Sequence, residues 1–174
     1  MKTKVIKILG MILLLSMAIP AVYAKGPTGK AGKSTVAHLY LYEKDPSDWS
    51  IVEDGAWGKL KYNIASDTFD FVFNGHGLEP DTSYTLIYYA DPWPGTGGTD
   101  ITSGTPNAEG DLHLMGSFNL GNMPIEADEN SLGAKIWLVL SDDYDAENDE
   151  MEGWNPAEYL FEYDLITYDD TDAP

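Results

Sequence analysis

LEPDTSYTLIYY, residues 78–89, is the stretch that decides the fold. Pro80 fixes its own φ angle and has no N–H to donate, so the chain bends at this point. Tyr84 then enters a strongly β-prone segment, where its ring can be buried while its hydroxyl reaches back to the backbone of the bend. This arrangement is a tyrosine corner, which is typical of Greek-key sandwiches.

Alternation of apolar and polar residues predicts antiparallel strands on both sides of this corner. The expected strands cover residues 35–43, 55–64, 68–74, 84–90, 101–104, 111–120, 134–141 and 159–168. The continuously apolar run 134–141 predicts a central strand that is covered on both faces. In the last strand, Tyr159, Phe161, Tyr163 and Leu165 are expected to share one face. The predicted fold is an all-β, antiparallel Greek-key β-sandwich of about seven or eight strands, with a jelly roll as the alternative.

The two ends of the chain differ in character from its middle. Residues 1–24 combine early lysines, a short apolar stretch and a small-residue ending at Ala24, which predicts a secretory signal peptide. An uncleaved amino-terminal anchor is the alternative. Residues 25–33 are expected to form a flexible leader, residues 34–168 the β-sandwich domain and residues 169–174 an acidic tail. No second apolar run is long enough to span a bilayer, so no membrane span is expected after signal cleavage.

Charge is the strongest feature of the composition. The chain has 29 acidic residues against 10 lysines, no arginine and no cysteine, and its formal net charge is −19. Because nucleic acids and anionic membranes need basic patches, a nucleic-acid partner is not expected. The excess of acid is typical of a protein kept soluble in salty surroundings, and it also favours cation binding.

The acidic loop 142–152 contains the best candidate metal ligands. Asp143, Asp145, Glu147 and Asp149 place oxygens at alternate positions, a spacing from which a loop can wrap a calcium ion. The helix-loop-helix calcium motif is excluded, because its glycine position falls on Asn148 and its closing glutamate position on Trp154. The alternative is a solvated loop, with calcium as the only candidate cofactor.

Aromatic residues near turns are the best candidate ligand-binding residues. Trp93, between two prolines, is expected to be exposed, and Trp49, Trp57 and Trp154 could join it in a platform for a sugar or an apolar partner. The alternative for Trp57 and Trp154 is that they cover the ends of the core.

The three histidines, His38, His76 and His113, are expected at half-exposed sheet positions, because their spacing does not suggest a zinc site. The sequence nominates no catalytic residue. Hydrolysis by a carboxylate pair stays open, but with 29 acids the sequence cannot select the pair.

Two local resemblances add to this interpretation. The pattern Leu78-x-Pro80-x-Thr82-x-Tyr84 resembles the corner of fibronectin type III and related immunoglobulin-like domains. The segments GAWGKLKYN, DPWPG and GAKIWLVLSDD are similar to those of exported proteins of methane-forming archaea. The second resemblance implies an exported or envelope-associated domain and no particular activity.

The function expected from the sequence is that of an exported, acidic β-sandwich module for binding, adhesion or envelope structure. Its expected location is extracellular or cell-envelope associated, and its expected partner is an extracellular protein or a polysaccharide. A secreted hydrolase that uses carboxylates is the alternative.

Overall fold

The computed structural model describes residues 35–90, 98–121 and 133–170. One antiparallel sheet dominates it, with the strand order β6-β5-β8-β11-β1-β2-β4-β7. These strands are β1 (Val36–Tyr42), β2 (Trp57–Asn63), β4 (Phe69–His76), β5 (Tyr84–Ala90), β6 (Thr99–Gly104), β7 (Leu112–Phe118), β8 (Ala134–Leu140) and β11 (Leu160–Glu162). The all-β, antiparallel prediction is therefore confirmed.

Four short elements complete the described fold. The strands β9 (Tyr144–Asp145) and β10 (Glu150–Met151) form a small hairpin, and β3 (Ala65–Ser66) pairs in parallel with β12 (Asp169–Asp170). Two 3-10 turns, η1 (Ser141–Asp143) and η2 (Pro156–Glu158), flank the hairpin. The acidic tail predicted from Asp169 thus begins with a paired strand, and its remaining residues lie outside the described part of the chain.

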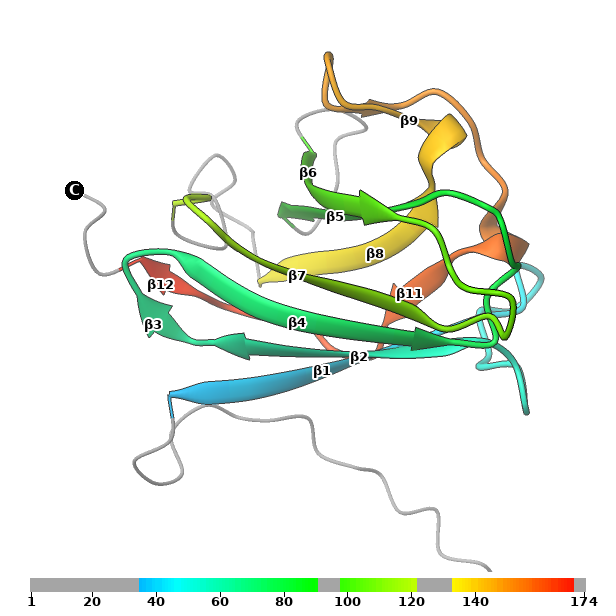
Figure 1. Cartoon of the computed structure of the whole chain (residues 1–174), viewed down its shortest axis with the longest axis horizontal. Helices are drawn as coiled ribbons and strands as arrows, with labels where there is room; N and C mark the ends of the chain where they lie inside the picture. The colour runs from blue at the N-terminus through cyan, green and yellow to red at the C-terminus, as the bar shows by residue number, and fades with distance from the viewer. Residues whose placement is uncertain (1–34, 91–97, 122–132, 171–174) are drawn as a thin grey trace, which may run out of the picture.

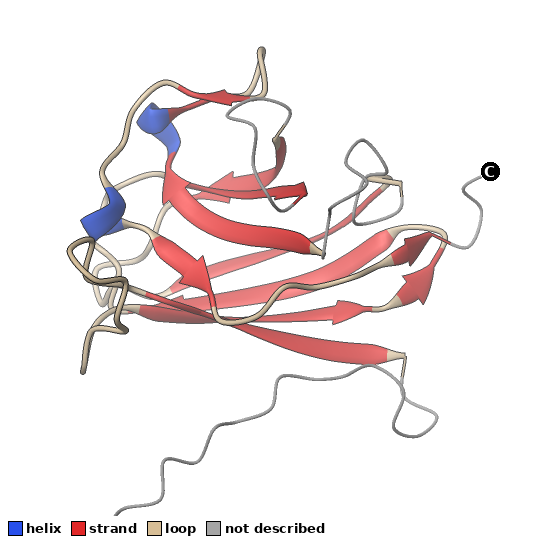
Figure 2. Cartoon of the chain, turned by 180° about the vertical axis from the view of Figure 1, so that it is seen from behind, coloured by secondary structure: helices blue, strands red, loops and turns tan. Residues whose placement is uncertain are grey.

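The main sheet folds over on itself into two layers, β1-β2-β4-β7 and β6-β5-β8-β11 (Figure 1). Its edge strands β6 and β7 come together, so the sheet is nearly closed. Gly104, in β6, shows how close the approach is, because a Cβ atom there would lie 2.7 Å from Leu114 Cδ2 of β7. Figure 2 shows the same arrangement from behind.

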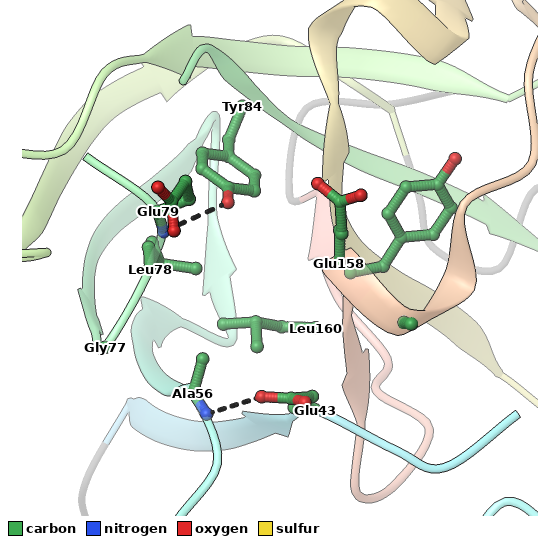
Figure 3. Close-up of a pocket in the computed structure, with 10 residues that line it drawn as sticks. Glu43, Ala56, Gly77, Leu78, Glu79, Tyr84, Glu158 and Leu160 are labelled. Carbon is green, nitrogen blue, oxygen red and sulfur yellow. Dashed lines mark hydrogen bonds between the residues drawn. The ribbon is translucent and has the colours of Figure 1, made fainter. Parts of the chain in front are cut away.

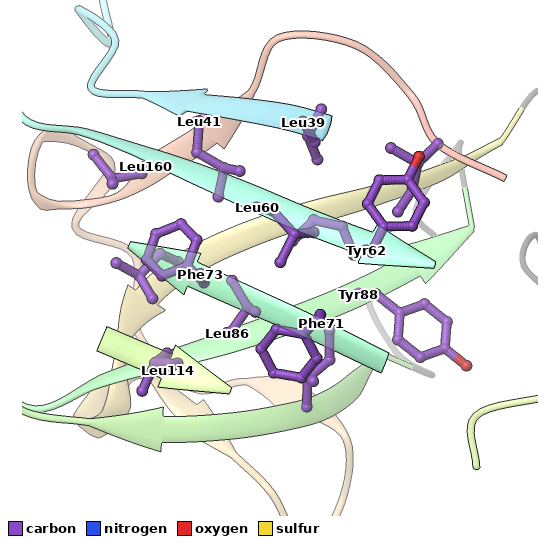
Figure 4. Close-up of a cluster of buried hydrophobic side chains, with 14 of the residues drawn as sticks. Leu39, Leu41, Leu60, Tyr62, Phe71, Phe73, Leu86, Tyr88, Leu114 and Leu160 are labelled. Carbon is purple, nitrogen blue, oxygen red and sulfur yellow. The ribbon is translucent and has the colours of Figure 1, made fainter. Parts of the chain in front are cut away.

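The space between the two layers holds the main core (Figure 4). The predicted hairpin 55–74 contributes the aromatic row, since Phe69 and Phe73 are fully buried. Leu60 of β2 pairs with Phe73 of β4, and Leu86 of β5 pairs with Leu138 of β8. Burying such side chains removes apolar surface from water, which stabilises each by about 1.5–3 kcal/mol.

The tyrosine corner forms as the sequence predicts. The ring of Tyr84 is buried, and the backbone N–H of Glu79 donates to its hydroxyl oxygen at 3.3 Å (Figure 3). Beside it lies a cavity of about 260 Å³, where the Glu43 carboxylate accepts the backbone N–H of Ala56 at 2.9 Å. The corner therefore fixes how β5 enters the β6-β5-β8-β11 layer.

The last predicted strand is shorter than expected, and its aromatic row is buried at one end and exposed at the other. Tyr159 and Phe161 pack against the outer side of β8, whereas Tyr163 is exposed and contacts the ring of Tyr42 on β1. Strand β11 ends at Glu162, after which Ile166 pairs with Ala134 in a single bridge. Because Phe161 pairs with Tyr42 and Tyr163 contacts the same Tyr42 ring, the predicted aromatic row Tyr159, Phe161 and Tyr163 follows the outer side of the sheet, and only its degree of burial changes along the segment.

Candidate functional site

Strand β8 has a second buried face, as its continuously apolar sequence predicts. Ile136 and Leu138 point into the main core, while Trp137 and Val139 belong to a second cluster on the outer side of the layer. That cluster is completed by residues of β5, of β11 and of the segment that contains the β9–β10 hairpin: Ile87, Tyr89, Tyr144, Tyr159 and Phe161. The acidic loop 142–152 is therefore folded and packs over the outer side of β8.

Asp143 anchors the acidic loop to the segment that follows it. Its buried carboxylate accepts both the Tyr159 hydroxyl and the Asn155 side-chain amide, the latter at 2.8 Å from Oδ2. Its backbone carbonyl accepts the N–H groups of Glu152 and Gly153. A buried carboxylate is stable only with partners of this kind, so the side chain has a structural role.

The other predicted calcium ligands serve different contacts. Asp145 is partly exposed and accepts the N–H groups of Glu147 and Asn148, which holds the hairpin turn. Asp149 accepts the Tyr144 hydroxyl at 3.4 Å. Within the described residues, no three histidine, aspartate or glutamate side chains come close enough to hold a metal ion. Calcium binding therefore stays a prediction, and the described geometry does not assemble the four ligands.

Next to the acidic loop lies an aromatic groove of about 420 Å³. It is lined by Trp49, Tyr89, Trp137, Trp154 and Phe161 together with three charged residues, Lys44, Lys135 and Glu162. Strands β5, β8 and β11 supply its floor, the loop after β1 supplies Trp49, and the segment before η2 supplies Trp154. The sequence singled out Trp49 and Trp154 but missed Trp137, which reads as an ordinary core residue of β8.

The aromatic rings form a continuous surface in two levels. Trp137 and Phe161 are buried at the base, with ring centroids 4.9 Å apart. Above them, Trp49 is 49% exposed and Trp154 is 51% exposed, with centroids 6.4 Å apart. Trp154 packs on Phe161 and so covers part of the outer cluster, while about half of its own surface stays exposed. Trp57, on β2, is 38% exposed and contacts the ring of His76.

Trp49 is displayed by a constrained loop. The loop folds back through a backbone bond from Asp45 N–H to the Ser50 carbonyl, and the N–H of Trp49 donates to the Asp45 carbonyl at 2.7 Å. Trp49 has a φ of +61°, a left-handed conformation that bulky residues rarely adopt. The loop therefore holds its indole at one defined position, edge-on to Phe161.

The base of the groove is polar at one end. Glu162 is buried, accepts Trp137 Nε1–H, and has its Oε1 3.9 Å from Lys135 Nζ. Lys44 Nζ donates to the Glu162 carbonyl at 2.9 Å. Burial raises the pKa of the Glu162 carboxyl, and the two lysines and the Trp137 N–H oppose that rise. Burial also lowers the pKa of the Lys44 ammonium.

This geometry bears on the other sequence-based candidates. Glu162 is the one carboxyl among the described residues that line the groove, whereas hydrolysis of a glycosidic bond ordinarily requires two. Trp93 lies outside the described residues. The three histidines lie on sheet positions of β1, β4 and β7, at least partly exposed as expected.

Comparison of the chain with protein-family models, curated proteins and solved structures finds no match. No helix in the described residues has both the length and the apolar character needed to cross a membrane.

Proposed function

We propose that this chain is an exported binding module whose aromatic groove holds a saccharide. The observation that carries the proposal is the pair of half-exposed indoles, Trp49 and Trp154, above the buried base of Trp137 and Phe161. Ligand pockets combine apolar walls with a few fixed polar groups, and this groove has both. The apolar C–H face of a sugar ring stacks on indole rings, while its hydroxyl groups take hydrogen bonds from the polar end.

The polar end favours a saccharide over a purely apolar partner. An apolar group placed over Glu162, Lys44 and Lys135 would desolvate charged groups without offering them new hydrogen bonds, which costs about 1–3 kcal/mol for each unsatisfied group. Sugar hydroxyls both donate and accept, so they suit a carboxylate and two ammonium groups at once. A carboxylate-based hydrolase is the weaker candidate, because Glu162 has no second carboxyl beside it among the described lining residues.

Trp154→Ala tests the groove. We expect binding of soluble oligosaccharides, measured by isothermal titration calorimetry with a panel of neutral, acidic and amino sugars, to weaken at least tenfold, or about 1.4 kcal/mol. Trp57→Ala is the matched control, since Trp57 is also a partly exposed tryptophan but does not line the groove. Equal binding by both variants, or binding of no oligosaccharide by the unaltered protein, would remove the proposal.

The exported location is a separate part of the proposal. It is supported by the basic, apolar and small-residue succession of residues 1–24 and by the acidic composition. Expression in the native cell should release or display a chain that begins at Lys25, which mass spectrometry of the extracellular and envelope fractions can measure. Recovery of the uncut chain only from the cytoplasm would contradict it.

A further inference from the structure

The outer side of the β1-β2-β4-β7 layer gathers the three histidines of the chain and two lysines, Lys59 and Lys61, which lie side by side along β2. Strand register places His38 of β1 opposite Lys61 of β2, and Lys59 opposite Asn74 of β4, which in turn lies opposite His113 of β7. His76 occupies the same outer side and stacks on Trp57. We call this surface the histidine face: His38, Trp57, Lys59, Lys61, His76 and His113.

The charge of this face contrasts with the rest of the molecule. It carries all three histidines of the chain and two of the four lysines in the described residues. The acids on it are Asp70, which accepts the Thr68 hydroxyl, and Asp111, which pairs with His76 Nδ1 at 2.7 Å. In a protein of net charge −19, such a surface attracts anionic groups.

The histidine face is also apolar enough to bury. Tyr40, which has the Lys59 ammonium 5.4 Å above its ring, is 39% exposed, and Met115 of β7 is 65% exposed. No described strand or 3-10 turn covers this side of the layer, as the two opposite views show (Figures 1 and 2). Exposed apolar side chains interspersed with lysines are typical of surfaces that a partner can cover.

The complementary surface lies on the opposite side of the same molecule. The β9–β10 hairpin and its flanks carry Asp142, Glu147 and Glu152, which are exposed, and Asp149 and Glu150, which are partly exposed. Figure 1 places β9 beyond β5 and β8, at the far end of the molecule from β1 and β2. One chain therefore presents a basic, aromatic face at one end and an acidic hairpin at the other.

We propose that the histidine face docks the acidic hairpin of a second copy of this chain, head to tail. The contact uses two different surfaces, so it leaves one histidine face and one hairpin unoccupied in each pair and can extend into a longer assembly. Salt supports such a contact, because the Debye length of about 8 Å at physiological ionic strength screens the repulsion between whole molecules more than the attraction across the contact.

Sedimentation velocity of the full chain over a concentration series tests the proposal. We expect reversible association, and at least a tenfold higher concentration for half-association in Lys59→Gln/Lys61→Gln. The hairpin variant Glu147→Gln/Glu152→Gln should show the same loss. An equimolar mixture of the two variants should recover complexes of two chains, because the intact hairpin of the first fits the intact face of the second.

The control is Thr105→Glu/Ala108→Glu, which lowers the net charge by two, as Lys59→Gln/Lys61→Gln does, at exposed positions outside both surfaces. It should associate like the unaltered chain. A chain that is monomeric at every concentration, an equal loss in the control, or a mixture that recovers nothing would each overturn the proposal. So would a monomeric chain that binds polygalacturonate through Lys59 and Lys61.

Discussion

Trp49 holds its backbone in a strained, left-handed conformation. A bulky side chain at a φ of +61° carries about 1–2 kcal/mol of backbone strain, which an asparagine or glycine would largely avoid. The strain persists because the surrounding backbone bonds and the packing on Phe161 hold the indole in place. The strained backbone thus displays an indole at the rim of the aromatic groove, which supports the proposed saccharide site.

Glu162 gives the domain a pH dependence that one substitution should remove. Its pKa is raised in the folded state, so the folded protein holds this proton more tightly than the unfolded chain does. The resulting stabilisation is present below the unfolded-state pKa and is lost as pH rises through the folded-state pKa. We expect the unaltered protein to lose unfolding free energy relative to Glu162→Gln as pH rises from about pH 4. Urea denaturation of both proteins at a series of pH values measures this change.

Glu53→Gln is the control for that measurement, because Glu53 is exposed and its loss removes the same charge. Its difference from the unaltered protein shows the general effect of one carboxylate on an acidic surface. If Glu162→Gln and Glu53→Gln give parallel pH profiles, the buried carboxyl does not contribute as described.

At the scale of elements, the acidic hairpin depends on Asp143. In Asp143→Asn, an amide N–H₂ replaces one of the oxygens that accept from Asn155 and the buried Tyr159 hydroxyl. We expect a loss of about 1–3 kcal/mol in unfolding free energy. Asp145→Asn should cost less than about 1 kcal/mol of unfolding free energy. Asp145 is partly exposed, and an amide oxygen in its place can still accept the backbone N–H groups of Glu147 and Asn148.

The same two variants separate the structural role from the predicted calcium site. Thermal unfolding in calcium and in chelator should show the same loss for Asp143→Asn in both. A loss that appears only with calcium would instead make Asp143 a metal ligand.

The strands were predictable because their signals are local. Alternation in 55–64 and 68–74, the bend at Pro80 and the apolar run 134–141 each determine an element within about ten residues. The roles of Asp143 and Trp137 were not predictable from the sequence. Their partners, Tyr159 and Glu162, lie 16 and 25 residues away and reach them only through packing. The aromatic groove joins three strands with two loops, so no single segment signals it.

At the scale of the whole molecule, the two candidate binding surfaces lie on different layers. The aromatic groove lies outside β8 and β11, and the histidine face lies outside β1, β2, β4 and β7. Tyr42 of β1 pairs with Phe161 of the groove and with Trp57 of the histidine face, so the two surfaces adjoin on the outer side of one sheet. The Trp57 control therefore also measures whether a change at this boundary reaches the groove.

The pairing of β1 with β11 also bears on when this domain can fold. Leu41 pairs with Glu162, so the first strand of the sheet gains one of its two neighbours only after 121 further residues have been made. Contacts between such distant positions slow folding, because the chain must close a long loop before they form. During synthesis the sheet therefore stays incomplete until its final strand emerges. A chain that folds this late stays unfolded for longer, and a membrane translocation channel requires an unfolded chain.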